Sequence, residues 1–236
     1  MGGRKQLYFI GHFVRLFNKE YERVMLLFLE ENPEARLLDL GCRDGQFTMK
    51  MANKIGTRYV YGVDLSEEEL EKAGDNGVGG IVGDLDKRFP IGDEAFDVVC
   101  ASQIIEHLSN TDGFLKEIYR VLKPGGYLVI STPNLASYHN VAYLLMGRQP
   151  PVAMVSDEMG EGWGRKNHNA GPAHRRLFTF PSFAKLLKYH GFKVERIVGS
   201  CYYPFPASLA RFMCLLDKGH SACINIKARK ESKCLV

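Results

Sequence analysis

Three aspartates in the first third of the chain are spaced in a way that suits the binding of one small ligand. Asp39 lies in an apolar run that enters a turn with glycines at positions 41 and 45, and Asp64 and Asp84 each close a later apolar run. Glycine lets a ligand approach the backbone, and an acid at the end of a second strand can accept hydrogen bonds from both ribose hydroxyls. The three acids predict a site for a neutral ribose joined to a cationic group. Asp64 and Asp84, each taken alone, could equally be helix N-caps.

The turn that follows Asp39 lacks the signatures of two common nucleotide sites. A dinucleotide site requires G-x-G-x-x-G and a phosphate-binding loop requires G-K-[ST], and neither pattern occurs at this turn. Three acidic strand ends also suit a pyrophosphate poorly, because like charges repel. The pattern therefore favours a ribose with a cation over a dinucleotide or a nucleoside triphosphate.

Four sequence blocks resemble the class I S-adenosylmethionine-dependent methyltransferase superfamily, in the branch that holds ubiquinone-biosynthesis-like and related small-molecule enzymes. They are, in order, LLDLGCRDGQF, VYGVDLS, GDLDKRFPIGDEAFDVVCASQIIEHL and VLKPGGYLVISTPN. The resemblance covers residues 35–134 well and residues 178–228 more loosely. It implies S-adenosylmethionine as the cofactor and methyl transfer to a small-molecule or lipid-like acceptor, without naming that acceptor.

Carried over by position, the resemblance assigns each part of the cofactor to a strand end. The methionine side falls to Asp39, Gly41, Cys42 and Gly45. The ribose falls to Asp64 and Leu65, the adenine to Asp84 and Leu85, and the sulfonium end to Ser102 and Gln103. The middle glycine of the family is Arg43 in this chain. We expect its side chain to point out of the turn, because it would otherwise occupy the place of the cofactor.

Methyl transfer from a sulfonium has a neutral leaving group, so the enzyme needs alignment, exclusion of water and sometimes a base. His107, next to Glu106, could be that base or a metal ligand, since some relatives hold a divalent ion with E-x-x-E-H here. Gln103 replaces the first acid of that motif, so we predict no metal, and the favoured interpretation is a helix-edge pair that shapes the methionine pocket. His174 is the preferred base, because it precedes the return of the chain to the core at residues 178–180.

Residues 134–177 interrupt the alternation of strands and helices. The segment is polar and rich in glycine and histidine, and a segment of this length without clear elements is usually functional or mobile. Its aromatic rings, histidines and paired arginines suit a lid over a ring-bearing or anionic acceptor. They are His139, Tyr143, Trp163, His168, His174, Arg175 and Arg176. A solvated loop is the alternative for each of them.

Apolar runs of strand length alternate with helical patterns along the rest of the chain. Strands are expected at 36–40, 59–63, 80–82, 96–101, 127–131, 192–198 and 222–228, and helices at 7–31, from 46, after 66, and at 111–122, 181–190 and 207–216. Ser66 and Glu69 predict a capping box. This order predicts an α/β fold, a Rossmann-like doubly wound, mostly parallel seven-stranded sheet with an antiparallel last strand and helices on both faces.

The length of 236 residues suits a single methyltransferase domain. We expect an N-terminal helical cap at 1–33, in which Tyr8, Phe13 and Phe17 could line a pocket, and a cofactor-binding core at 34–133. A lid or acceptor insertion at 134–177 and a C-terminal helix with strands at 178–236 would follow.

The composition limits the partners and the location of the protein. The net charge of +4 is mild and gives no strong nucleic-acid signature. No apolar run reaches the roughly 18 residues of a transmembrane segment. Without a secretory signal or a C-x-x-C pair among the six cysteines, the expected location is cytoplasmic. Two other functions stay open: a protein or RNA methyltransferase, favoured by a basic tail at Lys227–Lys233, and a cofactor-binding module without catalysis, favoured by Arg43 and Gln103. The oligomeric state stays open too.

Overall fold

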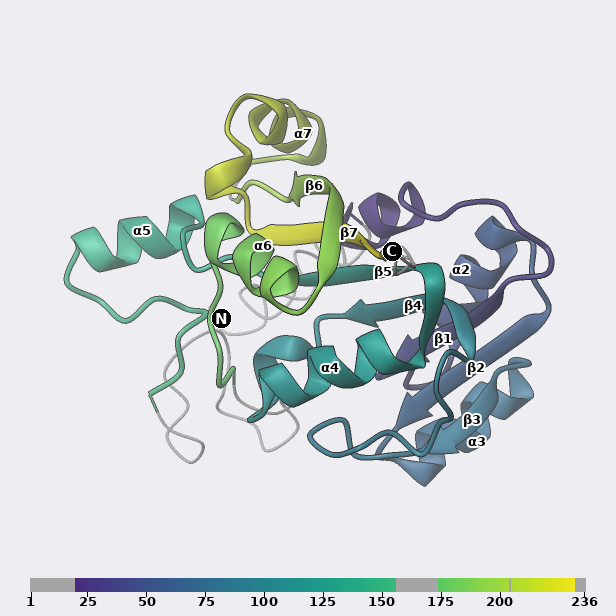
Figure 1. The fold of residues 1–236 in the computed structure, drawn as a ribbon. Helices are drawn as coiled ribbons and strands as arrows, with labels where there is room; N and C mark the ends of the chain where they lie inside the picture. Colours follow the sequence, from purple (N-terminus) through teal and green to yellow (C-terminus); the bar gives the residue numbers. More distant parts are fainter. Residues whose placement is uncertain (1–19, 156–173, 204, 232–236) are drawn as a thin grey trace, which may run out of the picture.

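The apolar runs form one seven-stranded sheet in the computed structural model, which describes residues 20–155, 174–203 and 205–231. The strand order is β3-β2-β1-β4-β5-β7-β6 (Figure 1). The strands are β1 (Arg36–Leu40), β2 (Tyr59–Asp64), β3 (Gly79–Val82), β4 (Phe96–Ser102), β5 (Leu122–Pro133), β6 (Phe192–Ser200) and β7 (Cys223–Lys230). β7 pairs antiparallel with both of its neighbours, and the pairs among β1 to β5 are parallel. The predicted sheet, with an antiparallel last strand, is therefore confirmed.

Helices cover both faces of the sheet, as the doubly wound prediction requires. They are α2 (Gln46–Ile55), α3 (Glu67–Asp75), α4 (Thr111–Val121), α5 (Tyr138–Leu145), α6 (Phe180–Tyr189) and α7 (Ala207–Leu216), with short 3₁₀ turns η1 (Ile105–His107) and η2 (Lys218–His220). Leu38 and Val99 lie in one core cluster with the apolar residues of α4 and α6. Leu37 and Val98, their neighbours in sequence, lie in a second cluster with α2, α3 and residues 24–29. Because successive strand residues face opposite sides, a sheet buried on both faces requires continuous apolar runs.

The N-terminal helix was predicted to run over 7–31, but it ends earlier. Among the described residues, the helix runs over 20–26 and a turn follows. The backbone N–H of Glu30 donates to the Tyr127 hydroxyl at 2.9 Å, and that of Asn32 donates to the Ile55 carbonyl at 2.8 Å. These bonds draw the chain toward the sheet before Pro33 is reached. Tyr8, Phe13 and Phe17 lie outside the described residues.

The insertion at 134–177 contains regular structure that the sequence did not predict. α5 begins after Ser137 and occupies eight of these residues. The prediction was wrong here because the helix buries Asn140 and exposes leucines, which inverts the pattern by which amphipathic helices are identified. Residues 156–173, with Trp163 and His168, lie outside the described part. None of the described helices is long and apolar enough to cross a membrane.

Two smaller predictions are corrected as well. β5 begins at Leu122 rather than at Tyr127, because Leu122 pairs with Phe96 before the chain bulges and Tyr127 resumes the ladder opposite Val98. At the start of α3, the Ser66 hydroxyl accepts from the backbone N–H of Glu69 at 3.3 Å, which is half of a capping box. The other half differs, because the Ser66 N–H donates to Asp64 at 3.0 Å instead.

Candidate active site

The turn after β1 brings its glycines to the carboxyl end of the sheet. Gly41 and Gly45 both have positive φ, at 78° and 74°. The N–H of Gly41 donates to the Val63 carbonyl at 2.8 Å, which ties the turn to the end of β2. A Cβ on Gly41 would lie 2.3 Å from the Cδ1 atom of Ile104. The residues after β4 therefore pack directly against the glycine turn, and a side chain at position 41 would separate them.

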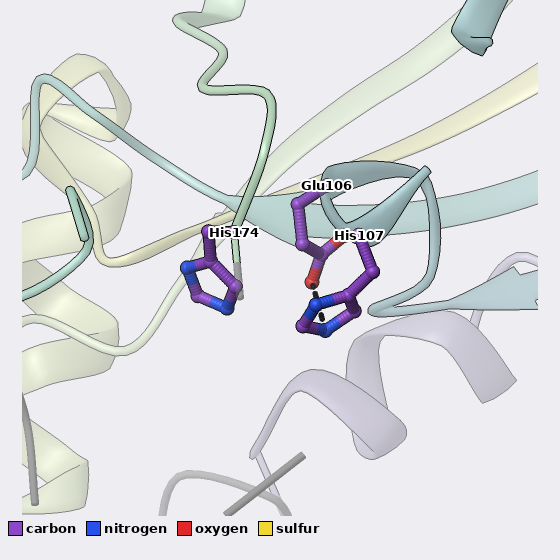
Figure 2. A group of neighbouring side chains, drawn as sticks. All are labelled: Glu106, His107 and His174. Carbon is purple, nitrogen blue, oxygen red and sulfur yellow. Dashed lines mark ion pairs between the residues drawn. The ribbon is translucent and has the colours of Figure 1, made fainter. Parts of the chain in front are cut away.

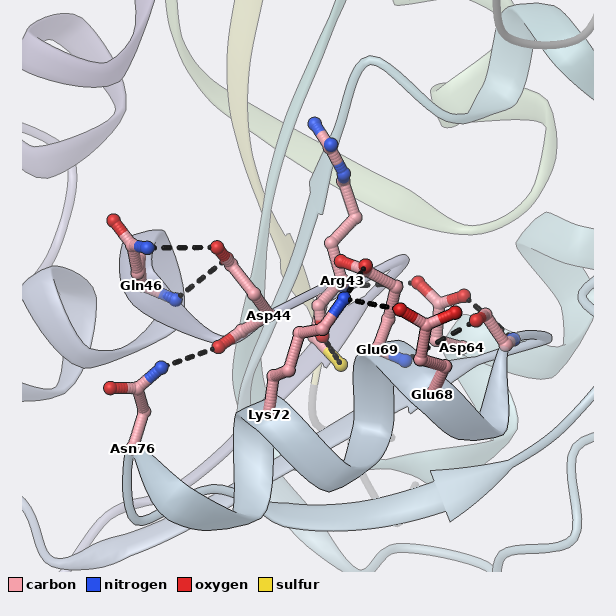
Figure 3. A network of polar contacts seen from close by, with 10 residues as sticks. Arg43, Asp44, Gln46, Asp64, Glu68, Glu69, Lys72 and Asn76 are labelled. Atoms are coloured by element: carbon pink, nitrogen blue, oxygen red, sulfur yellow. Dashed lines mark hydrogen bonds and ion pairs between the residues drawn. The ribbon is translucent and has the colours of Figure 1, made fainter. Parts of the chain in front are cut away.

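Asp64 joins the end of β2 to this turn. One carboxylate oxygen accepts from the Arg43 N–H and the other accepts from the Ser66 N–H, each at 3.0 Å (Figure 3). Two backbone donors hold the carboxylate in one orientation, and each oxygen keeps a lone pair for a further hydrogen bond. A carboxylate fixed in this way at the end of the second strand has the chemistry to accept from ribose hydroxyls.

Leu65 and Val82 make the neighbouring surface apolar. Their exposed fractions are 68% and 53%, which are large for apolar side chains at strand ends. Val82 lies opposite Asp64 in the parallel ladder, so the apolar surface adjoins the carboxylate. A flat adenine ring beside a ribose fits such a surface. Val82 was not among the predicted site residues. Its position at the end of β3 is the feature that could have identified it.

Asp84 and Leu85 follow β3 at the same edge. Asp84 accepts from the Asp86 N–H at 3.0 Å and pairs with Lys87 at 3.2 Å, and these contacts keep the pKa of its carboxyl below the ordinary value. An ionised carboxylate can accept a hydrogen bond from an exocyclic amine. Leu85 is buried in the core instead, so its side chain contributes to the floor beneath this edge.

Asp39 and Cys42 are more deeply buried than a direct contact with the cofactor suggests. Asp39 accepts from the Thr48 hydroxyl at 2.6 Å. Burial raises the pKa of Asp39 to about 7, and the nearby Asp64 carboxylate adds to the effect. The Cys42 side chain packs against Gly62, where a Cβ would lie 2.4 Å from the sulfur. Both residues therefore support the turn through these buried contacts, with Thr48 and with Gly62.

Arg43 adopts a left-handed backbone conformation with φ of 50°, which a glycine would adopt without cost. Its side chain is exposed and extends away from the Asp64 carboxylate (Figure 3). The arginine therefore takes the backbone shape of the family's glycine while keeping its side chain out of the Asp64 contact.

Ser102 and Gln103 end β4 beside the turn. Gln103 also has positive φ, at 55°, and its amide donates to the Ser131 hydroxyl at 3.0 Å. The Tyr21 hydroxyl bonds to Ser102, and burial raises the pKa of this tyrosine to about 12. Tyr21 was not among the predicted site residues, because a tyrosine in a helical pattern carries no signal of its own.

A second group of side chains gathers just after β4. Glu106 is buried in η1, and its carboxylate accepts from the Thr132 hydroxyl at 3.1 Å. Its other oxygen, Oε1, has no hydrogen-bond partner among the residues that the structure describes. Burial raises the pKa of Glu106 to about 8. The nearest cationic candidate is His107, whose Nε2 atom lies 4.0 Å from that oxygen.

His174 comes from the far side of the insertion to join this pair. The rings of His107 and His174 have centroids 4.9 Å apart (Figure 2). The backbone N–H groups of Arg175 and Arg176 both donate to the Glu106 carbonyl, at 2.7 and 3.0 Å. Their guanidinium groups reach the hydroxyl and the carbonyl of Ser109. The arginines that the sequence assigned to a lid thus hold His174 beside η1.

Glu106, His107 and His174 could also hold a divalent metal ion. One ligand atom from each lies within 4.8 Å of the others. Two imidazoles and one carboxylate form a known type of facial metal site. The prediction of no metal considered an isolated acid–histidine pair, and the structure adds a third potential ligand to it. Gln103, at the position of the missing acid, bonds to Ser131 instead.

His139 and Tyr143, the other described members of the insertion, lie on α5. Burial lowers the pKa of His139 to about 4, so its ring is neutral at physiological pH. Its ring packs against Tyr203 at 5.6 Å between centroids. Tyr143 is exposed on the outer side of α5. The cluster of Glu106, His107 and His174 includes neither residue.

Comparisons with known proteins agree with this arrangement. A family model described as a methyltransferase domain matches residues 11–197. The chain is 28% identical over 180 residues to the mitochondrial ubiquinone biosynthesis O-methyltransferase of Rattus norvegicus, covering 72% of this chain and 48% of that protein. It is 23% identical over 180 residues to a demethylmenaquinone methyltransferase of Desulfitobacterium hafniense, covering 72% and 69%. The chain thus spans about half the length of the rat relative.

A solved methyltransferase structure has a similar fold. An S-adenosylmethionine-dependent methyltransferase from Mesorhizobium loti superposes with a TM-score of 0.63 at 22% identity, covering 88% of this chain and 96% of that one. At this identity the likeness concerns the fold alone, and the family model supplies the assignment. The chain therefore belongs to the methyltransferase domain family.

Proposed function

We propose that this enzyme methylates a small-molecule or lipid-like acceptor that binds beside Glu106, His107 and His174. The observation that carries the proposal is the position of this cluster. Ile104 packs on Gly41 of the cofactor turn, and Glu106 and His107 follow two and three residues later in η1. An acceptor placed at the cluster would therefore lie next to the cofactor.

The cofactor-binding residues of the proposal are those placed at the four strand ends. They are Asp39, Gly41, Cys42, Gly45, Asp64, Leu65, Asp84, Leu85, Ser102 and Gln103. Asp64 would bind the ribose, Asp84 and the Leu65 surface would hold the adenine, and the buried Asp39 would act by supporting the turn. When bound, S-adenosylmethionine supplies an electrophilic methyl group on a cationic sulfur.

His174 is the proposed base, with His107 as its partner. The Nδ1 atom of His174 lies 3.1 Å from the Val152 carbonyl. A carbonyl can only accept, so this contact assigns the proton to Nδ1 and makes Nε2 the basic nitrogen of the neutral ring. Nε2 would take the proton of an acceptor hydroxyl or amine as the methyl group arrives. Glu106 is buried, and its raised pKa keeps it neutral, so it would limit the access of water to the two imidazoles.

Lipid-like acceptors are favoured by the relatives. One of the two named above is, by its name, an O-methyltransferase of ubiquinone biosynthesis, and the other a demethylmenaquinone methyltransferase. A protein or RNA methyltransferase is the runner-up, and a cofactor-binding module without catalysis is the third possibility. Two residues favoured the third possibility: Arg43 fits the turn with its N–H bonded to Asp64, and Gln103, which follows β4, bonds to Ser131.

Turnover with labelled cofactor on fractionated cell extract, followed by mass spectrometry of the product, tests the proposed acceptor class. His174→Ala should lower the turnover number and leave the affinity for the cofactor nearly unchanged. His220→Ala, which removes an exposed histidine on η2, serves as the control. Label that appears in protein or RNA would reject the acceptor class, and full activity of His174→Ala would reject the base.

The proposal assigns no metal to the reaction. Activity should therefore survive dialysis against a strong chelator. Retention of one equivalent of metal by the purified protein, together with loss of activity on chelation and recovery on adding the ion, would replace the base by a metal site with the same three side chains.

A further inference from the structure

The two helices that lie outside the layers of the fold turn large apolar side chains to the solvent. Figure 1 shows α5 beyond the ends of the strands and α7 beyond the β6 edge of the sheet. A helix on the surface of a globular protein normally buries its apolar side and exposes its polar side. Both α5 and α7 depart from that rule.

α5 is inverted. Asn140, with 1% of its surface exposed, faces inward, and its amide donates to the Asn134 carbonyl at 3.0 Å. Leu144 and Met146 are exposed on the outside, and Leu145 has an exposed fraction of 83%. Polar groups thus hold this helix to the protein, and its apolar groups are left for a partner.

α7 has the same character. Ala210 is its buried residue, and Arg211 ties the helix to Glu20 through an ion pair of 3.0 Å. Leu209, Phe212 and Leu216 are exposed at helical spacing on one face, and Leu215 beside them has an exposed fraction of 84%. The larger apolar side chains of α7 therefore contribute little to the core.

Aromatic rings connect the two helices through the buried Tyr202. The ring of Tyr138, at the start of α5, lies 6.2 Å from that of Tyr202, which lies 6.1 Å from that of Phe205, just before α7. Tyr138 and Phe205 are exposed. We call the exposed residues of α5 and α7, with these two rings, the outer apolar face. Patches of this continuity mark docking sites rather than chance exposure.

The charges around the outer apolar face identify the kind of partner. Residues 134–150 and 201–216 contain no aspartate or glutamate. Arg148 follows α5 and Lys218 follows α7, and both are exposed. Two acids lie close to the face, and both are engaged: Asp217 by Tyr202 at 3.0 Å and by His220 at 2.7 Å, and Glu20 by Arg211 at 3.0 Å. An apolar face with exposed basic residues at its border and neighbouring acids already paired matches an anionic lipid surface.

We propose that the outer apolar face docks this enzyme on an anionic lipid bilayer, with α5 and α7 lying in the interface between headgroups and acyl chains. The proposal rests on the lipid-like acceptor proposed above and adds how such an acceptor reaches the site. The chain runs from α5 to Val152, whose carbonyl contacts His174. An acceptor that leaves the bilayer at α5 would therefore enter close to the cluster.

Vesicle flotation of the full chain tests the docking. Wild type should bind vesicles of phosphatidylcholine mixed with phosphatidylglycerol more tightly than vesicles of phosphatidylcholine alone. Leu145→Glu and Leu215→Glu should each weaken binding to the mixed vesicles by about tenfold or more, because each removes a leucine from the interface and adds a charge that anionic lipid repels. Tyr189→Glu, on α6 and with an exposed fraction of 81%, is the matched control and should bind as wild type does.

The outcomes separate this proposal from its alternatives. Cofactor binding by calorimetry should be equal in all four proteins, which shows that the exposed substitutions leave the fold intact. The docking proposal would be overturned if wild type binds neither kind of vesicle, or if the two leucine variants bind as wild type does. A dimer that forms in solution without vesicle binding and is lost in Leu145→Glu would assign the face to a second copy instead. Flotation needs no turnover, so methylation of a quinone in detergent without vesicle binding would leave the proposed function standing.

Discussion

Asp64 is the side chain on which the proposed cofactor site depends most directly. Its two oxygens are oriented by the N–H groups of Arg43 and Ser66, one from the turn and one from the start of the next helix. A carboxylate held from both sides can meet a ribose without losing conformational freedom on binding, which favours affinity.

Asp64→Ala should weaken S-adenosylmethionine binding by about tenfold to a hundredfold or more, since a hydrogen bond to a charged group is worth about 1.5–3 kcal/mol. Isothermal titration calorimetry measures the change. Asp75→Ala, at the exposed end of α3, is the control and should bind normally. Unchanged affinity in Asp64→Ala would remove this carboxylate from the site.

Glu106 makes a prediction about stability rather than binding. Burial raises the pKa of Glu106 to about 8 in the folded protein, against an ordinary value of 4.5. In the unfolded chain the group ionises above about pH 4.5, but in the fold it stays neutral until about pH 8. Its contribution is therefore fully present below pH 4.5 and is lost as the pH rises to 8, at up to about 1.4 kcal/mol for each pH unit.

Glu106→Gln should accordingly gain stability relative to wild type as the pH rises from 5 to 8. Urea unfolding at several pH values, in the presence of a chelator, gives the two free energies of unfolding. Glu71→Gln, an exposed position on α3, should run parallel to wild type. If Glu106→Gln also runs parallel, the carboxyl is ionised in the fold and the neutral Glu106 of the proposed site is wrong.

At the scale of elements, the contact between the glycine turn and the segment after β4 links the proposed cofactor site to the proposed acceptor site. Gly41 must be small for two reasons, because its φ is positive and because Ile104 leaves no room for a Cβ. Ile104 leads into η1, which carries Glu106 and His107. A disturbance at the turn should therefore reach the acceptor cluster.

Gly41→Ala should weaken cofactor binding and destabilise the protein by about 1–3 kcal/mol beyond the cost of positive φ alone, which is the usual penalty of an overpacked core. Gly147→Ala isolates the backbone cost, since its φ of 66° is similar and its Cβ would meet nothing within 4 Å. Thermal unfolding and calorimetry compare the two variants. Equal losses in both would show that Ile104 moves aside freely and that the contact has no role.

At the scale of the whole molecule, residues 227–230 of the basic stretch belong to β7 rather than to a tail. Lys227 and Arg229 lie in β7 and pair with Glu30 and Glu195. Lys230 pairs with Glu94 and donates to the Leu122 carbonyl at 2.7 Å. The prediction of a basic tail was wrong for these three residues, because carboxylates from other parts of the chain neutralise them.

The full chain should therefore bind nucleic acid only weakly, with a Kd no tighter than about the 10⁻⁴–10⁻⁶ M of non-specific binding at physiological salt. Fluorescence anisotropy with a labelled RNA, repeated over a range of salt, measures this. Submicromolar binding with a steep dependence on salt would restore the RNA methyltransferase as the leading function. Removal of the stretch is no test, because it would delete half of β7.

Much of the fold and of the cofactor site was determined by the sequence alone, and the reason is that both depend on local patterns. Continuous apolar runs specify strands buried on both faces, and an acid that closes such a run lies at the carboxyl edge whatever the rest of the chain does. Asp64 and Asp84 are at that edge as predicted. The position of Val82 and Leu65 at the same edge of the sheet follows from the register of β2 and β3, in which Val82 lies opposite Asp64.

Only the tertiary structure decided which distant residues meet. His174 reaches Glu106 because two backbone bonds and two arginines clamp its segment to η1, and no periodicity in the sequence records such a contact. α5 escaped prediction because its apolar side faces out, and pattern rules assume the reverse. The cations of β7 looked free because their partners, Glu30, Glu94 and Glu195, lie elsewhere in the chain. Whether a charge is paired or an apolar surface is covered depends on the residues that lie against it, and these contacts form only when the chain has folded.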